Sequence, residues 1–138
     1  MPPGPDDTPP APAYRLSIAV EGGLLRAQVE GEIDAQAVRL AYWREIVDTA
    51  RAHQCRLLLV IDRKKTRPAS SAELAALAMA FRAHRDDFER IGVFEPTAAF
   101  VPAIEHAEIH GRALGINVRI FSDPVEAERW VRFGSADD

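Results

Sequence analysis

The feature that most constrains the fold is a run of five apolar residues near the middle of the chain, Leu57-Leu58-Leu59-Val60-Ile61. Two of the five are β-branched, which favours a strand. A continuous apolar run of this length, bounded by Arg56 and Asp62, is typical of a strand buried on both faces, as parallel strands are. A helix core is the alternative, but the predicted helices on either side leave little room for it. The run therefore predicts the central strand of an α/β domain.

The residues before this strand predict a β-hairpin. Apolar and polar residues alternate on both sides of Gly22-Gly23, and paired glycines supply the positive φ angles of a tight turn. Similar patterns place the other elements. We expect strands at 14–20, 25–29, 57–61, 91–94 and 118–121, and helices at 34–53, 70–81 and 99–114, with a last helix that begins at Asp123-Pro124.

Helix signals support these assignments. Ser70 and Glu73 have the spacing of a capping box, and Gly115 is expected just beyond the end of the third helix. In the first helix, an apolar line of four residues marks the expected core face, and Tyr42 lies off that line, so we expect Tyr42 to be partly exposed. The four residues of the line are Leu40, Trp43, Val47 and Ala50.

The resulting order, ββαβαβαβα, predicts a single α/β domain. Strands that alternate with helices imply right-handed crossovers, so we expect a five-stranded, mostly parallel sheet with an antiparallel N-terminal hairpin and helices that cover it. The domain is expected at 14–133. Residues 1–13 hold six of the ten prolines and predict a disordered tail, and 134–138 predict a disordered C-terminus.

Composition narrows the classes of function. The net charge of −4 argues against nucleic-acid binding, and no apolar run approaches the about 18 residues of a membrane span, so no integral membrane association is expected. No secretory signal is evident at the start of the chain. The lone Cys55 has no internal disulfide partner, which predicts a reducing, cytoplasmic location.

The strongest local candidate for a site is the basic segment Arg63-Lys64-Lys65-Thr66-Arg67. It follows the central strand and precedes the helix that begins at Ser70-Ser71. Ligands of open α/β sheets collect outside the carboxyl ends of the strands, and a helix N-terminus favours anions. The segment therefore predicts a site for an anion or a protein partner at Arg63, Lys64, Lys65, Arg67, Ser70 and Ser71. The alternative is a solvated loop.

Other constellations are weaker. His106 and His110 stand four residues apart on the third helix, a spacing found in helical zinc sites, but no third ligand is evident and a solvated face explains them. Cys55 leads into a buried strand, where a small apolar residue fits better than a nucleophile. We therefore predict no catalytic residues, no metal and no cofactor.

The element order, together with three segments, resembles the STAS domain superfamily, in particular its SpoIIAA-like branch of anti-sigma-factor antagonists. The segments are Val29-Glu30-Gly31-Glu32-Ile33-Asp34-Ala35, Leu57-Leu58-Leu59-Val60-Ile61-Asp62 and Val118-Arg119-Ile120-Phe121-Ser122-Asp123. The resemblance implies a non-enzymatic regulatory or ligand-binding module, with Ser70 or Ser71 as a phosphorylation candidate. Ala69-Ser70-Ser71-Ala72 lacks the aspartate and the glycine of the family's Asp-Ser-Ser-Gly motif.

That branch is grouped with the CRAL-TRIO lipid carriers, which implies an alternative function. In that case the protein carries an apolar or anionic metabolite in a cleft between the third helix and the sheet, with Phe100 in its lining. A homodimer is also possible, because the strand 14–20 forms an exposed sheet edge that can pair with a second copy. Arg15 and the tail argue against such pairing.

Overall fold

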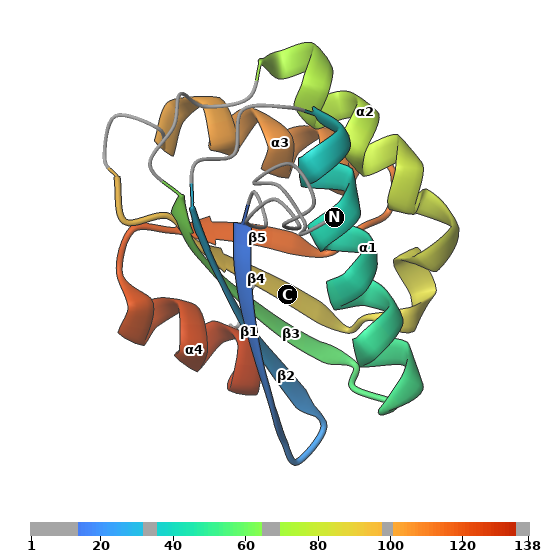
Figure 1. The fold of residues 1–138 in the computed structure, drawn as a ribbon, viewed down its shortest axis with the longest axis vertical. Helices are drawn as coiled ribbons and strands as arrows, with labels where there is room; N and C mark the ends of the chain where they lie inside the picture. The colour runs from blue at the N-terminus through green and yellow to red at the C-terminus, as the bar shows by residue number, and fades with distance from the viewer. Residues whose placement is uncertain (1–13, 32–35, 65–69, 98–100, 135–138) are drawn as a thin grey trace, which may run out of the picture.

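The computed structural model describes residues 14–31, 36–64, 70–97 and 101–134. It confirms the predicted α/β order and adds one short 3₁₀ helix, η2 (Figure 1). The predicted tail at 1–13 lies outside the described residues. The elements are β1 (Tyr14–Glu21), β2 (Leu24–Gly31), α1 (Gln36–Ala52), β3 (Leu57–Lys64), α2 (Ser71–Phe81), η2 (Arg82–Asp87), β4 (Arg90–Phe94), α3 (Val101–Ala113), β5 (Val118–Phe121) and α4 (Pro124–Phe133).

The hairpin closes as the paired glycines predict. Gly22 and Gly23 have φ angles of 52° and 86°, and β1 pairs antiparallel with β2 from Tyr14 opposite Gly31 to Glu21 opposite Leu24. Two successive positive φ angles are the requirement of a type I′ turn, which matches the twist of the flanking strands. All later strand pairs are parallel.

The central strand is longer than its apolar run. β3 continues past Ile61 to Lys64, because β2 pairs with it over its whole length and ends at Gly31 opposite Lys64. Backbone hydrogen bonding therefore extends the strand after its apolar residues end. As a result, Arg63 and Lys64 belong to the strand and not to the loop that the sequence predicted.

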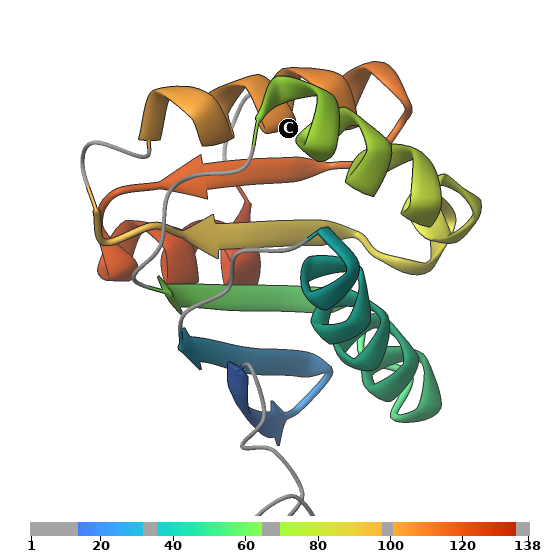
Figure 2. The ribbon, with the colours of Figure 1, turned by 45° about the horizontal axis from the view of Figure 1, so that its top comes forward.

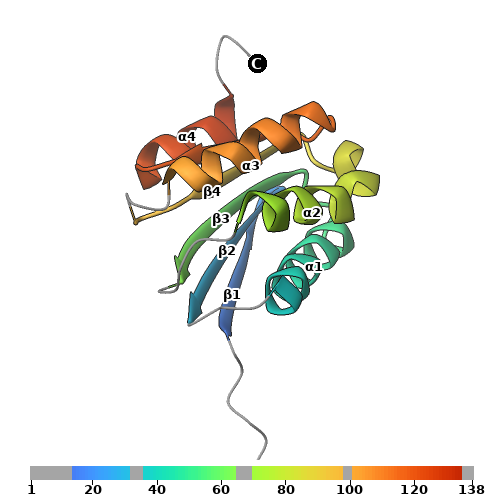
Figure 3. The same ribbon diagram turned by 90° about the horizontal axis from the view of Figure 1, so that it is seen from above.

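The strands lie in the order β1-β2-β3-β4-β5, so each parallel crossover steps one place in the same direction. Right-handed crossovers then place every connecting helix on the same face. Figure 2 shows α1, α2 and α3 along that face, whereas α4 packs on the other face against β3, β4 and β5 (Figure 3). The strand order never reverses, so the sheet has none of the switch-point crevices where ligands of doubly wound sheets bind.

Each face of the sheet has its own apolar core. The larger core lies under α1, α2 and α3, and the smaller lies under α4 around Trp130. Gly92 of β4 permits the close approach of α4, because a β-carbon at this position would collide with the side chain of Val131. The central strand serves both cores, with Leu58 and Val60 on the larger side and Leu59 on the smaller.

The buried face of α1 differs from the prediction. Tyr42 is only 2% exposed, whereas Leu40 and Trp43 are half-buried. The helix turns a neighbouring stripe towards the sheet, and this stripe also includes the charged residue Arg39. Tyr42 packs against Tyr14 of the edge strand, with ring centroids 5.7 Å apart. The apolar pattern excluded this stripe because it contains a charge.

The predicted caps of two helices are confirmed. The side chain of Ser70 accepts a hydrogen bond from the backbone N–H of Glu73, and the Glu73 carboxylate accepts one from the backbone N–H of Ser70. The side chain of Asp123 caps α4, with Pro124 in the first turn. Among the described residues, no helix has both the length and the apolar character that crossing a membrane requires.

Candidate functional site

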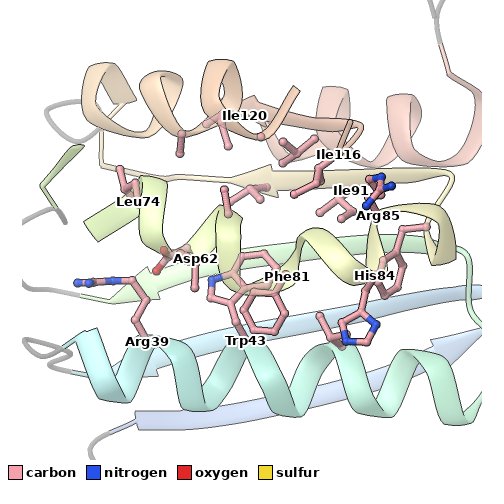
Figure 4. Close-up of a pocket in the computed structure, with 18 of the residues that line it drawn as sticks. Arg39, Trp43, Asp62, Leu74, Phe81, His84, Arg85, Ile91, Ile116 and Ile120 are labelled. Atoms are coloured by element: carbon pink, nitrogen blue, oxygen red, sulfur yellow. The ribbon is translucent and has the colours of Figure 1, made fainter. Parts of the chain in front are cut away.

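A cavity of about 130 Å³ lies between the larger face of the sheet and the helices that cover it (Figure 4). Its walls come from α1, α2, η2, α3 and strands β3 to β5. The lining residues are Arg39, Tyr42, Trp43, Val47, Asp62, Leu74, Leu77, Ala78, Phe81, His84, Arg85, Phe88, Ile91, Val93, Ala107, Gly111, Ile116, Val118 and Ile120.

The lining of the cavity is almost entirely apolar. An apolar cavity of roughly 150 Å³ in another protein stays free of water and takes up benzene. The space therefore suits a body of about the size of one aromatic ring.

Small side chains on the helices create this space. Ala78 of α2 and Ala107 of α3 stand where larger residues would fill a helix–sheet interface. Gly111 of α3 instead allows close packing, because a β-carbon there would lie 2.8 Å from Cγ1 of Val118. The hollow thus follows from residue size at two positions, one on each helix.

One end of the cavity holds a buried charged group at the carboxyl edge of the sheet. Arg39 and Asp62 line this end and are only 4% and 6% exposed. Nη1 of Arg39 donates to Gln36 at 2.8 Å and lies 3.5 Å from the carboxylate of Glu73, while its Nε–H is buried without a hydrogen-bond partner in the described part of the chain.

Tyr42 lies among several charged groups at this end. Burial raises the pKa of Tyr42, and the negative charges of Asp62 and Glu95 raise it further, whereas Arg39 opposes them. Glu95 is 1% exposed, and its Oε1 accepts a hydrogen bond from the backbone N–H of Thr97. The phenol of Tyr42 therefore stays neutral at any ordinary pH.

The other end of the cavity lies beside η2 and carries positive charge. His84 and Arg85 line it (Figure 4). Nδ1 of His84 lies 3.2 Å from the carboxylate of Asp87, which also pairs with Arg51 at 3.2 Å. Arg85 makes a single hydrogen bond within the described residues, from Nη1 to the carbonyl oxygen of Arg82. Its other N–H groups can therefore donate to a ligand.

Cys55, His106 and His110, which the sequence raised as reactive or metal-binding groups, do not line the cavity. Cys55 is buried and does not line the cavity, and burial raises the pKa of its thiol, which disfavours the reactive thiolate. His106 and His110 are both exposed on α3. Among the described residues, no group of three or more potential ligands is placed to hold a metal ion.

The structure describes only part of the predicted basic site. Arg63 lies on the α4 side of the sheet, with its guanidinium carbon 6.0 Å from the ring centre of Phe94. Ser70 and Ser71 are exposed at the start of α2, which covers the other face. Lys65 and Arg67 lie outside the described residues, as does Phe100, so their roles stay predictions.

Sequence reasoning missed the residues that give the cavity its polar ends. Arg39 and Arg85 belong to no recognisable motif. One available signal was the position of Arg39 three residues before Tyr42, which places both on one helical stripe. This stripe was therefore an alternative buried face of the helix, beside the apolar line through Leu40 and Trp43.

The comparisons with known proteins add no family. No protein-family model matches the chain, and a search of curated proteins finds no match either. The resemblance to the STAS superfamily therefore stays a prediction.

Proposed function

We propose that this protein is a non-enzymatic ligand-binding module whose cavity holds a small molecule with an apolar body and one acidic group. The observation that carries the proposal is the cavity of about 130 Å³ beneath α1, α2 and α3. It develops the carrier function that the sequence offered as an alternative, with the ligand under the helices and not on the basic segment.

The size and lining of the cavity support an apolar body. A ring-sized group would make van der Waals contacts with the apolar walls of the cavity. Shape and apolar surface therefore supply most of the expected affinity. This favours a single aromatic ring or a short branched chain over a long acyl chain.

The charges at the two ends support an acidic group beside Arg85. At the carboxyl edge of the sheet, Arg39 already donates to Gln36 and lies 3.5 Å from the carboxylate of Glu73. At the other end, Asp87 is already shared by Arg51 and His84, so the charge of Arg85 is not offset by it. A carboxylate that reaches Arg85 would accept a charge-assisted hydrogen bond.

The resemblance to STAS domains fits a module of this kind, because the element order on which it rests is present in the structure. A regulatory role, with Ser70 or Ser71 exposed for modification, remains part of the proposal. A cytoplasmic location is proposed from the single buried thiol of Cys55. No chemical step is assigned to the protein.

A ligand series tests the proposal directly. Benzoate, benzene and benzylamine share a ring but differ in charge, and titration calorimetry with the whole chain would rank them. We expect benzoate to bind most tightly and benzylamine least. Native mass spectrometry of freshly purified protein would show whether a small acid co-purifies. If none of the three ligands bound, the proposed function would be wrong.

A matched pair of variants tests the role of Arg85. Arg85→Met keeps an apolar stem but removes the charge, and Arg82→Met does the same at an exposed neighbour that does not line the cavity. We expect Arg85→Met to weaken benzoate about tenfold or more and to leave benzene unchanged. Equal benzoate affinity in both variants would refute the assignment of the acidic group.

A further inference from the structure

The edge strand β1 offers a surface for a second copy of the chain. β1 spans Tyr14–Glu21 and has β2 as its only strand neighbour within the described residues (Figure 3). Its side chains on the larger core side are only partly covered, and Val20 is 44% exposed. The strand therefore presents both unpaired backbone and apolar surface at the edge of the sheet.

β1 lacks three of the devices that protect an edge strand, namely proline, lysine and a bulge. It contains no proline and no lysine, and it pairs with β2 at every position from Tyr14 to Glu21 without a bulge. Natural proteins use short strands, lysine, proline, bulges or covering segments to stop such edges from pairing. An open edge of eight residues is thus expected to find a partner strand.

The hairpin turn determines which backbone groups face outward. In a two-residue turn the flanking residues, Glu21 and Leu24, form a hydrogen-bonded pair, and such pairs recur at every second residue. Along β1, the residues that direct N–H and C=O groups towards β2 are therefore the odd-numbered ones. Leu16, Ile18 and Val20 direct theirs towards the free edge.

We propose that β1 pairs antiparallel with β1 of a second copy, with the twofold axis at Ile18. An isologous pair of strands must join even-numbered residues to even-numbered residues, so its centre falls on one residue. With the centre at Ile18, Leu16 stands opposite Val20 of the partner copy, and Arg15 stands opposite Glu21 of the partner copy. Opposite charges and apolar residues then meet at matching positions.

Neighbouring registers lose this complementarity. A centre at Ser17 places Arg15 opposite Ala19 and leaves Glu21 beyond the strand of the partner copy. A centre at Ala19 places Glu21 opposite Ser17. Cross-strand pairs of opposite charge stabilise a sheet, so the register at Ile18 is favoured over both.

In this register Arg15 does not oppose pairing, because it forms an ion pair with Glu21 of the partner copy. Glu21 has side-chain contacts with Arg132 at 2.9 Å and Arg26 at 3.6 Å, both through Oε2. Oε1 is the atom that Arg15 of the partner copy would reach. The pairing would join two five-stranded sheets into one and would reduce the exposure of Val20. It uses no residue of the cavity lining, so it stands independently of the proposed ligand.

Charge variants of the full chain test the pairing by sedimentation over a wide range of protein concentration. Wild-type protein is expected to show a monomer–dimer equilibrium. Arg15→Glu places like charges opposite each other twice and should weaken the dimer about thirtyfold, while Arg15→Gln should have a smaller effect. Ser17→Glu is the control, because it adds a negative charge opposite the neutral Ala19. A monomeric wild-type protein, or equal dimerisation of Arg15→Glu and Ser17→Glu, would overturn the proposal.

Cysteine cross-linking tests the register. Ile18→Cys would bring two thiols across the axis within the Cα–Cα range of 4.4–6.8 Å that a disulfide requires. Ser17→Cys would cross-link only if the centre lay at Ser17. We expect a covalent dimer under mild oxidation from Ile18→Cys and not from Ser17→Cys, with wild-type protein as a control for the buried Cys55. The reverse pattern would overturn the register.

Discussion

Filling the cavity should stabilise the protein and abolish ligand binding. Ala78 of α2 lines the cavity and packs partly against the larger core, so a longer side chain at this position points into existing space. Ala78→Leu adds three carbon atoms to the lining without a large change in helix propensity. The substitution therefore tests whether the hollow exists and whether ligands use it.

The expected gain can be worked out from the size of the side chain. Each buried methylene contributes about 0.8 kcal/mol, so three carbons contribute up to about 2.4 kcal/mol. Ordering the leucine side chain costs about 0.5–1 kcal/mol. The net gain of about 1.5 kcal/mol corresponds to a rise in Tm of about 6 °C for a domain of this size.

Thermal unfolding followed by circular dichroism would measure this shift. Benzene at ten times its Kd should raise the stability of the wild-type protein by about 1.4 kcal/mol and that of Ala78→Leu by almost nothing. Ala76→Leu, at an exposed position on the same helix, is the control and should move Tm by little. Ala107→Leu tests the opposite wall. If Ala78→Leu lowered Tm, or still bound benzene normally, the reasoning about the cavity would be refuted.

Three other predictions follow from local contacts. Gly92→Ala should cost about 1–3 kcal/mol in chemical denaturation, because the added methyl group would push against Val131, and a cost below about 0.5 kcal/mol would contradict this packing. A hydrogen bond from Arg26 holds the pKa of Glu128 below its usual 4.5, so the pair stabilises the protein above that pH and loses its effect as pH falls through the lowered pKa. Glu128→Gln should flatten the stability profile below pH 4.5, and an unchanged slope would count against the pair. Cys55 should resist iodoacetamide at about pH 8 until the protein is denatured, since burial raises its pKa, and rapid native labelling would show that it is accessible.

The fold was largely predictable because its signals are local. The run from Leu57 to Ile61 could only be a buried strand once helices flanked it, and the paired glycines specified the hairpin. Right-handed crossovers then gave the parallel sheet. The extension of β3 to Lys64 was not visible, because it depends on the length of β2 as a pairing partner and not on the character of Arg63 or Lys64.

The candidate site was less predictable because it depends on tertiary packing. The sequence pointed to the basic segment after β3, and that site stays a prediction because Lys65 and Arg67 lie outside the described residues. The cavity under the helices was not predicted from the residues that line it. The burial of Tyr42 and Arg39 depends on the rotation of α1 over the sheet, which periodicity fixes only to within about one residue on either side.

The sequential order of the strands also explains why the cavity lies under α1, α2 and α3. Sequential crossovers set three helices side by side on one face, and the middle one, α2, must reach the sheet between its neighbours. Leu74 is its only buried residue, although the helix is rich in apolar residues, and Ala78 is among the residues that line the cavity. Larger residues at Ala78 and Ala107 would have filled the interface at no cost to helix formation. Alanines at these two positions leave an apolar hollow, and a ligand that enters it would make the contacts that larger side chains would otherwise make.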